Sequence, residues 1–447
     1  MNISVFGLID VFIAIFFLIV LVIYCFINWN INKEKAYFKY YLPNFFFKLL
    51  MALLFVLTSV YVIGGGDTFA YYEGALKLNN LFWENPSGYF NELFSTPSQF
   101  SIGNNFSNST GYPPGWIYKE PESFFICKLL SIPNFFCLNS YLALTIFCSF
   151  LVSVASWKLY EMIKDFTIST NTWKVFACFF IPTVTFWCSG ISKDTIVLSS
   201  FFFLLYHIFS ILDEKRKFRI NNLFYIILYV FILYHTRSFM LTAIGGPILL
   251  SFGIGFLKKI SKNKGLIFFV RFFIIIGTII SIIIAASQVE SILPEEYLNE
   301  MAVVQQDFKN NQTYTGPRYS LGIEDYSPTG MLLSAPSAII AAFFRPFLWE
   351  ASSAFLLLSA LEGTLLFYLL FRFVFSNGGI LIRIQSIRKN EFLIFCFVFV
   401  LILGFFVGFS SVLLNVLIRF KAPILPLLVL LLSSGIVVNT NPNSKNS

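Results

Sequence analysis

The sequence predicts an all-α protein that crosses a membrane many times, and three observations support this class. Hydrophobic residues make up 57% of the 447 residues, and charged residues only 12%. The mean hydropathy is +0.76, well above the range of soluble globular proteins. Many apolar runs also reach the roughly 20 residues that an α-helix needs to cross a hydrocarbon core about 30 Å thick. We therefore expect a polytopic membrane protein.

The apolar runs predict about 11 membrane spans, and roughly 10 to 13 are compatible with their lengths. The first run lacks a basic n-region and a small-residue cleavage site, so we interpret it as a retained span. No repeat of fixed period is evident, and residues 1–447 are expected to form a single transmembrane domain. The predicted spans lie near residues 5–27, 46–63, 136–157, 174–190, 195–212, 222–235, 238–257, 266–287, 353–372, 392–412 and 422–438.

The basic residues orient these spans. With the N-terminus outside, most of the 31 Lys and Arg residues fall in inner loops, whereas most of the 23 acidic residues lie outside. The inner set includes Lys48 and the runs DEKRKFR (213–219) and KKISKNK (258–264). We therefore interpret the net charge of +8 as topogenic, and we expect no nucleic-acid partner.

Two large extracytoplasmic loops, each with short helices, follow from this topology. The first covers residues 64–135, in which 97–114 is expected to be irregular. The second covers residues 288–350, with a short helix near 294–308. Its apolar end, 330–350, is predicted to be a re-entrant or interfacial helix, because counting it as a span would place the next basic cluster outside.

Ionisable residues gather where the predicted spans meet the outer surface. Asp67, in GGGDTFAYYEGA (64–75), directly follows the second span. Lys193 and Asp194 cap a tight hairpin, and Arg237 lies between the next two spans. Charged groups near hydrocarbon cost several kcal/mol, so each is a candidate functional residue. The remaining members of this outer set are Glu73, His235, Arg345, Glu350, Arg419 and Lys421.

Cations and a carboxylate at one membrane face suit a particular chemistry. Arg and Lys bind phosphate or pyrophosphate, and a carboxylate can take a proton from an acceptor group. Together they fit the transfer of a sugar from a lipid carrier to an acceptor.

Four segments resemble motifs of the GT-C superfamily of integral-membrane glycosyltransferases. GGGDTFAYYEGA places Asp67 at the start of the first long loop, followed by Tyr71 and Tyr72. TGYPPGWIYKEPESFFICKLLS (110–131) is similar to the segment with two prolines that precedes the next span of these enzymes. IPTVTFWCSGISKDTIVLSSFFFLLY (181–206) resembles their span–turn–span hairpin, with Asp194 in the turn. RFKAPILPLLVLL (419–431) resembles the opening of a late span.

The resemblance implies a fold, a reaction and roles for individual residues. Asp67 would be the catalytic base of a single inverting displacement. The leaving polyprenyl phosphate would be stabilised by cations. No DxD or ExD carboxylate pair follows Asp67, so we expect neither a metal nor another cofactor. The residues predicted to bind substrate are Tyr71, Tyr72, Lys193, Asp194, Arg237, Arg345, Arg419 and Lys421.

The sequence therefore predicts a glycosyltransferase with a polyprenyl-phosphate sugar donor. The acceptor would be an envelope glycan, a lipid or a protein, at the outer side of a bacterial inner membrane and among its lipids. Two alternatives stay open: a polymerase or ligase of surface polysaccharides, and a non-enzymatic transport or assembly subunit. Two residue roles also stay open, since Asp67 fits a helix cap and Arg345 fits a structural ion pair with Glu350.

Overall fold

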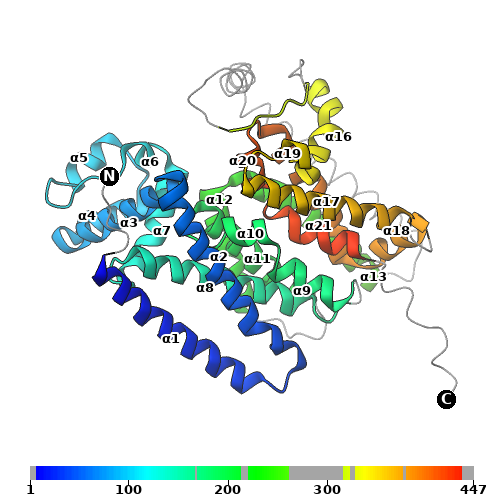
Figure 1. Cartoon of the computed structure of the whole chain (residues 1–447), viewed down its shortest axis with the longest axis horizontal. Helices are drawn as coiled ribbons and strands as arrows, with labels where there is room; N and C mark the ends of the chain where they lie inside the picture. The colour runs from blue at the N-terminus through cyan, green and yellow to red at the C-terminus, as the bar shows by residue number, and fades with distance from the viewer. Residues whose placement is uncertain are drawn as a thin grey trace. The chain divides into compact units, whose positions relative to one another are not determined.

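The computed structural model confirms the all-α class (Figure 1). Within the described residues, the one β-type contact is an isolated bridge between Arg318 and Leu413. The chain forms two compact units: residues 1–161, 184–207 and 219–238 make the first, and the rest make the second. The structure describes residues 7–166, 169–212, 220–260, 316–322, 328–375 and 379–434.

The first unit contains two long apolar helices, a group of shorter helices, one further long helix in full and most of two others. Hydrophobic side chains from α3, α7 and α8 form its core, together with Ile191 and Ile196. The helices are α1 (Leu8–Asn32), η1 (Ala36–Tyr40), α2 (Tyr41–Thr58), η2 (Ser59–Ile63), α3 (Asp67–Glu84), α4 (Pro86–Phe94), α5 (Gln99–Asn105), α6 (Gly115–Lys119), α7 (Pro121–Phe136), α8 (Tyr141–Ile163), α10 (Pro182–Trp187), α11 (Lys193–Leu212) and α12 (Ile220–Thr236).

The second unit is built around α19, which packs along α16 and also contacts α21. The second unit also takes the C-terminal end of α11. Its helices are α9 (Asn171–Phe179), α13 (Ser238–Ile260), α16 (Pro328–Phe344), η3 (Leu348–Glu350), α17 (Ala354–Phe375), α18 (Gly379–Lys389), α19 (Glu391–Ser410), α20 (Leu414–Phe420) and α21 (Ile424–Ser433).

Six described helices are long and apolar enough to cross a membrane: α1, the segment Ala36–Ile63, α8, α11, α17 and α19. The pair α20 and α21, bent by 68°, makes a seventh if the two helices are one broken span. The predicted span 174–190 is instead two short helices, α9 and α10, and 222–235 is the 17-residue α12. The predicted span 266–287 and helix 294–308 lie outside the described residues. The membrane class is thus supported, whereas the count of 11 is not confirmed.

The first predicted loop is largely helical. Helix α3 packs along α7, and Leu78 and Cys127 are fully buried between them and their neighbours. The irregular structure predicted for 97–114 is wrong for Gln99–Asn105, which form α5. A capping box explains this helix: the Ser98 side chain accepts from the Ser101 backbone N–H, and the Ser101 hydroxyl accepts from the Ser98 N–H.

Three glycines turn the chain sharply between η2 and α3. Gly64, Gly65 and Gly66 have φ angles of 72°, 151° and 106°, a region that side chains with a Cβ rarely adopt. The backbone N–H of Gly65 donates to the Ser59 carbonyl oxygen at 3.0 Å, which closes the end of η2. The turn lets α3 begin at Asp67, directly after a membrane-length helix.

Glycines also allow α16 and α17 to pack closely with their neighbours. A Cβ added at Gly363 would lie 2.6 Å from the Phe344 carbonyl oxygen, and one at Gly408 would overlap the Ala338 carbonyl group. Helix α16 coincides with most of the segment predicted to be re-entrant or interfacial, and it continues through Pro336. Its placement relative to the membrane stays a prediction.

We expect Gly408→Ala to lower the free energy of unfolding by about 2 kcal/mol, because α19 would have to move away from α16. Gly245→Ala is the matched control, since a Cβ there meets no atom within 4 Å. It should leave stability unchanged or raise it by up to about 1 kcal/mol, the helix propensity gain. Thermal or denaturant unfolding of the purified protein in detergent measures both, and equal effects would contradict the close packing.

Candidate functional site

The two units divide the predicted site residues between them. Each group is therefore described within its own unit. The first unit holds Asp67, Tyr71, Tyr72, Lys193, Asp194 and Arg237, and the second holds Arg345, Arg419 and Lys421.

Asp67 is the first residue of α3 and is partly exposed. The N-cap position belongs to Gly66, so the open interpretation of Asp67 as a cap is corrected: it lies one residue inside the helix. A carboxylate in the first turn is favoured by the partial positive charge of the helix N-terminus. The fold therefore holds this carboxylate at the end of an apolar helix without enclosing it.

Tyr71 and Tyr72 lie in the hydrophobic core of the first unit, with exposed fractions of 3% and 8%. The Tyr72 hydroxyl donates to the Asn139 carbonyl oxygen at 2.6 Å, and its ring meets Tyr141 edge-on. Burial raises the pKa of Tyr72 to about 12, so the phenol stays a neutral donor. These contacts give both rings a packing role, and their substrate role stays a prediction.

Asp194 and Arg237 form a buried ion pair. The Arg237 Nη2 donates to Asp194 Oδ1 at 2.5 Å, and the two side chains are 7% and 2% exposed, respectively. Asp194 is in the first turn of α11, whereas Arg237 directly follows α12. Two residues that the sequence assigned to separate membrane-edge clusters are thus joined.

Lys193 makes a second, more exposed ion pair. Its Nζ lies 2.6 Å from Oε2 of Glu122, on the first turn of α7, and half of the Glu122 side chain is exposed. Glu122 was not among the predicted residues. The sequence could have indicated Glu122, because it follows Pro121, the N1 proline of α7, and lies in the segment that resembles a GT-C motif.

The turn that carries Lys193 is tightly built. The Thr195 hydroxyl donates to the Gly190 carbonyl oxygen at 2.6 Å, and the Ser192 hydroxyl caps the Thr195 N–H at 3.1 Å. Gly190 lies against the Phe55 ring of α2, with no room for a Cβ. Because Ile191 shares one core cluster with the tyrosines of α3, the turn and the start of α3 belong to one packed assembly.

In the second unit, Lys421 is fully buried at the break between α20 and α21. Its Nζ donates to the Arg345 carbonyl oxygen at 2.8 Å. The Arg345 guanidinium lies 3.5 Å from Glu350 and 4.9 Å from the ring centroid of Tyr319. The ion pair that the sequence left open for Arg345 is therefore present, whereas Arg419, at the end of α20, is partly exposed.

Sequence reasoning missed two charges inside predicted membrane helices. Glu362, on α17, accepts hydrogen bonds from the backbone N–H and the hydroxyl of Thr183, and it interacts electrostatically with Lys421. The sequence did contain an indication, because Glu362 is a lone carboxylate in an apolar run, and such a residue is a candidate functional residue. Lys48, assigned to an inner loop, is instead buried on α2 and donates to the Thr185 hydroxyl at 2.9 Å.

A further buried carboxylate holds the short helices of the first unit together. Glu92 accepts from the Asn105 amide at 2.7 Å and from the Tyr118 hydroxyl at 3.2 Å. Lys128 lies near it and donates to the Ser95 carbonyl oxygen at 2.7 Å. Burial lowers the pKa of Lys128, and Glu92 opposes that shift. The network links α4, α5, α6 and α7 and so has a structural role.

No family model matches the sequence, and comparison with curated proteins and with solved structures finds no match. Among the described residues, no group of three or more His, Cys, Asp or Glu side chains could hold a metal ion. The candidate site therefore consists of the Asp67 carboxylate and the cations of the first unit, Lys193 and Arg237.

Proposed function

We propose that the protein is a membrane glycosyltransferase that moves a sugar from a polyprenyl-phosphate donor to an envelope glycan, lipid or protein. The reaction would take place at the outer face of a bacterial inner membrane. The observation that carries the proposal is the position of Asp67: a partly exposed carboxylate at the first turn of a helix that directly follows a membrane-length helix. The resemblance of four segments to GT-C motifs supports the same reaction class.

The proposed step is a single displacement at the anomeric carbon of the sugar. The Asp67 carboxylate takes the proton of the acceptor group, whose freed electron pair forms the new glycosidic bond. The bond from the anomeric carbon to the phosphate oxygen breaks at the same time, and its electron pair leaves with the polyprenyl phosphate. A positioned base contributes about 10²–10⁴-fold to such a reaction.

Lys193 is the cation of the first unit best suited to the donor phosphate. Its partner Glu122 is half exposed, so this ion pair reaches solvent, and the phosphodiester monoanion of the donor can replace that carboxylate. Arg237 is different, because Asp194 already neutralises it in the protein interior. We assign the Asp194–Arg237 pair to fixing the turn that carries Lys193.

The proposal is tested by mass spectrometry of lipids that co-purify with the full-length protein. We expect a polyprenyl phosphate in the wild type and at least about tenfold less in Lys193→Gln, which loses the phosphate contact. Glu122→Gln is the matched control, because it breaks the same ion pair but keeps the lysine. Loss of the lipid in both variants, or in neither, would contradict the assignment of Lys193. If no polyprenyl phosphate co-purifies with the wild type, that result would count against a polyprenyl-phosphate sugar as the donor.

Transport is the second candidate function, and one observation favours it. In the second unit, α9 ends at Phe179, shortly before Pro182, and α20 is bent from α21 by 68°. Glu362 and Lys421 lie at these interruptions, and charges at broken membrane helices are typical of transporters. The test is proton flux into proteoliposomes that contain the protein. A flux that Glu362→Gln abolishes but Asp67→Asn does not change would favour transport over glycosyl transfer.

A further inference from the structure

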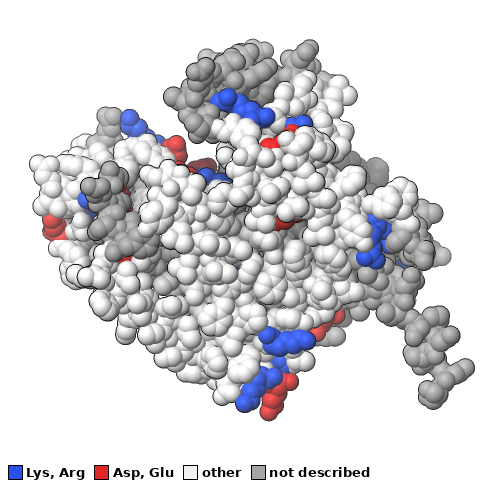
Figure 2. Space-filling view, in the orientation of Figure 1, with Lys and Arg blue, Asp and Glu red and all other residues white. Residues whose placement is uncertain are grey.

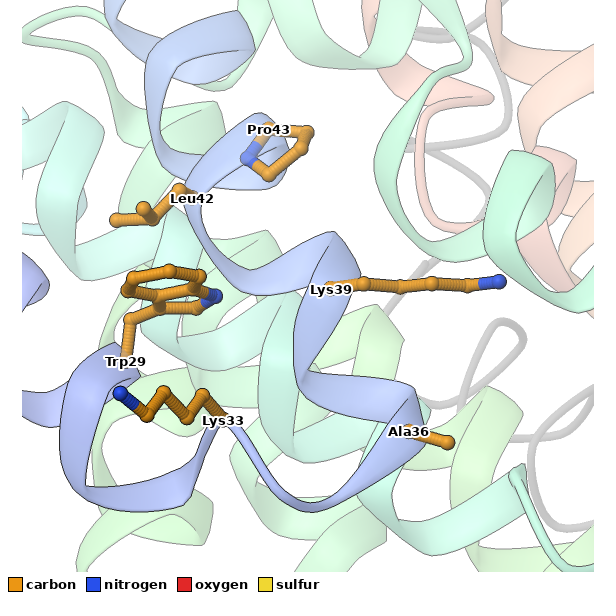
Figure 3. Close-up of a pocket in the computed structure, with 6 residues that line it drawn as sticks. All are labelled: Trp29, Lys33, Ala36, Lys39, Leu42 and Pro43. Atoms are coloured by element: carbon orange, nitrogen blue, oxygen red, sulfur yellow. The ribbon is translucent and has the colours of Figure 1, made fainter.

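The hairpin between α1 and α2 contains a cavity that the proposed reaction does not use. Figure 3 shows it from the side of the hairpin, and its volume is about 480 Å³, which is within the range of ligand sites. Helix α2 and η2 separate the hairpin from Asp67 by roughly 30 Å at 1.5 Å per helical residue. The cavity is lined by Trp29, Lys33, Ala36, Lys39, Leu42 and Pro43.

Two lysines give this cavity a positive charge. Lys33 and Lys39 are exposed, and among the described residues neither is paired with a carboxylate. In Figure 3 the Lys33 side chain points to the side of the hairpin where Trp29 lies, whereas Lys39 extends in the opposite direction. The Lys39 Nζ lies 5.0 Å from the ring centroid of Tyr40. Figure 2 shows both basic and acidic side chains at the lower edge of the view, where Figure 1 places this hairpin, and the residues that line the cavity include only the basic kind.

The hairpin joins two membrane-length helices, so we expect its residues to lie at the level of the lipid headgroups. Only 11% of the apolar window of α1 is buried in the protein, which leaves most of that helix to lipid. Trp is enriched at the level of headgroups, and Lys reaches from there towards phosphate. The predicted topology places this end on the cytoplasmic side, where anionic lipids attract basic residues.

We propose that this cavity binds the headgroup of an anionic phospholipid. Lys33 contacts the phosphate from the Trp29 side, and the exposed Lys39 side chain turns from its present direction to contact the phosphate from the other side. Trp29 and Leu42 pack against the glycerol and the first methylene groups. A lysine is a compact charge that suits a phosphate monoanion, and no carboxylate lines the cavity to oppose it. The site is independent of the proposed glycosyl transfer.

Native mass spectrometry of the full-length protein tests the site, with phosphatidylglycerol and phosphatidylcholine of identical acyl chains. Lys33→Gln and Lys39→Gln should each weaken phosphatidylglycerol binding about fivefold, and the double variant about 25-fold. Lys35→Gln is the matched control, since Lys35 is on the same hairpin but is held by the Asn32 side chain at 2.8 Å and lies outside the cavity. It should bind phosphatidylglycerol as the wild type does.

Three outcomes would overturn the proposal. The first is equal weakening by Lys35→Gln, which would indicate general surface charge. The second is equally tight binding of phosphatidylcholine, because its choline group cancels the charge that the lysines recognise. The third is competition by millimolar inorganic phosphate that displaces the lipid completely, which would make the ligand a free anion and not a lipid headgroup.

Discussion

Asp67→Asn should lower the rate of sugar transfer by about 10²–10⁴-fold, because asparagine keeps the shape of the side chain but cannot accept the proton. The fold should be retained, since a first-turn carboxylate contributes only about 0.3–1 kcal/mol to a helix. The measurement is single-turnover transfer from a synthetic polyprenyl-phosphate sugar, with thermal unfolding recorded on the same preparation.

Glu84→Gln is the control for this experiment. Glu84 ends α3, at the opposite end from Asp67, and it binds the exposed Ser109 hydroxyl at 2.7 Å. It should leave the transfer rate unchanged. Full activity of Asp67→Asn would reject the base and would favour a polysaccharide polymerase or ligase, which relies on loop arginines and histidines.

Arg237→Met should lower the free energy of unfolding by about 3–5 kcal/mol. The reason is that Asp194, only 2% exposed, would keep a buried charge without its 2.5 Å partner. The double variant Asp194→Leu/Arg237→Met removes both charges and should recover most of that loss. Denaturant unfolding in detergent gives the three free energies that the comparison needs. A double variant no more stable than Arg237→Met would mean that the pair does not carry the effect.

The double variant also decides the role of Arg237 in the reaction. If the ion pair only fixes the turn, the recovered protein transfers sugar at close to the wild-type rate. A stable double variant that has lost donor binding would instead assign Arg237 to the phosphate, as the sequence predicts. Lys193→Gln in the same assay gives the size of the loss expected for a direct phosphate contact.

The all-α membrane class was predictable because composition alone indicates it, whereas the position of the charged clusters at a membrane edge stays a prediction. The number of spans was not. An apolar run shows that a segment can enter a membrane, but not where its helix stops. Pro182 begins α10 after α9 has ended, and Pro423 lies at the bend between α20 and α21. Glu362 and Lys421 make contacts at these interruptions, and the sequence does not reveal their tertiary partners.

The sequence singles out candidate site residues, but it does not show which of them form pairs. Lys193, Asp194 and Arg237 were all singled out, yet their neighbours in sequence do not indicate that Lys193 meets Glu122 and Asp194 meets Arg237. The sequence also does not show which residues of α3 are buried. Tyr71 and Tyr72 therefore resemble exposed interfacial rings in the sequence, although both are buried in the structure. Residues that are far apart along the chain become partners through tertiary packing. Tertiary packing produces no local pattern in the sequence from which such partners could be predicted.

The Asp194–Arg237 pair also has a consequence for how the protein is made. The two residues are 43 positions apart, so Asp194 is synthesised several seconds before its counter-ion, at about 5–20 residues per second. During that interval the first turn of α11 carries an uncompensated carboxylate. We therefore expect the start of α11 to become fixed against the end of α12 only after Arg237 has been synthesised.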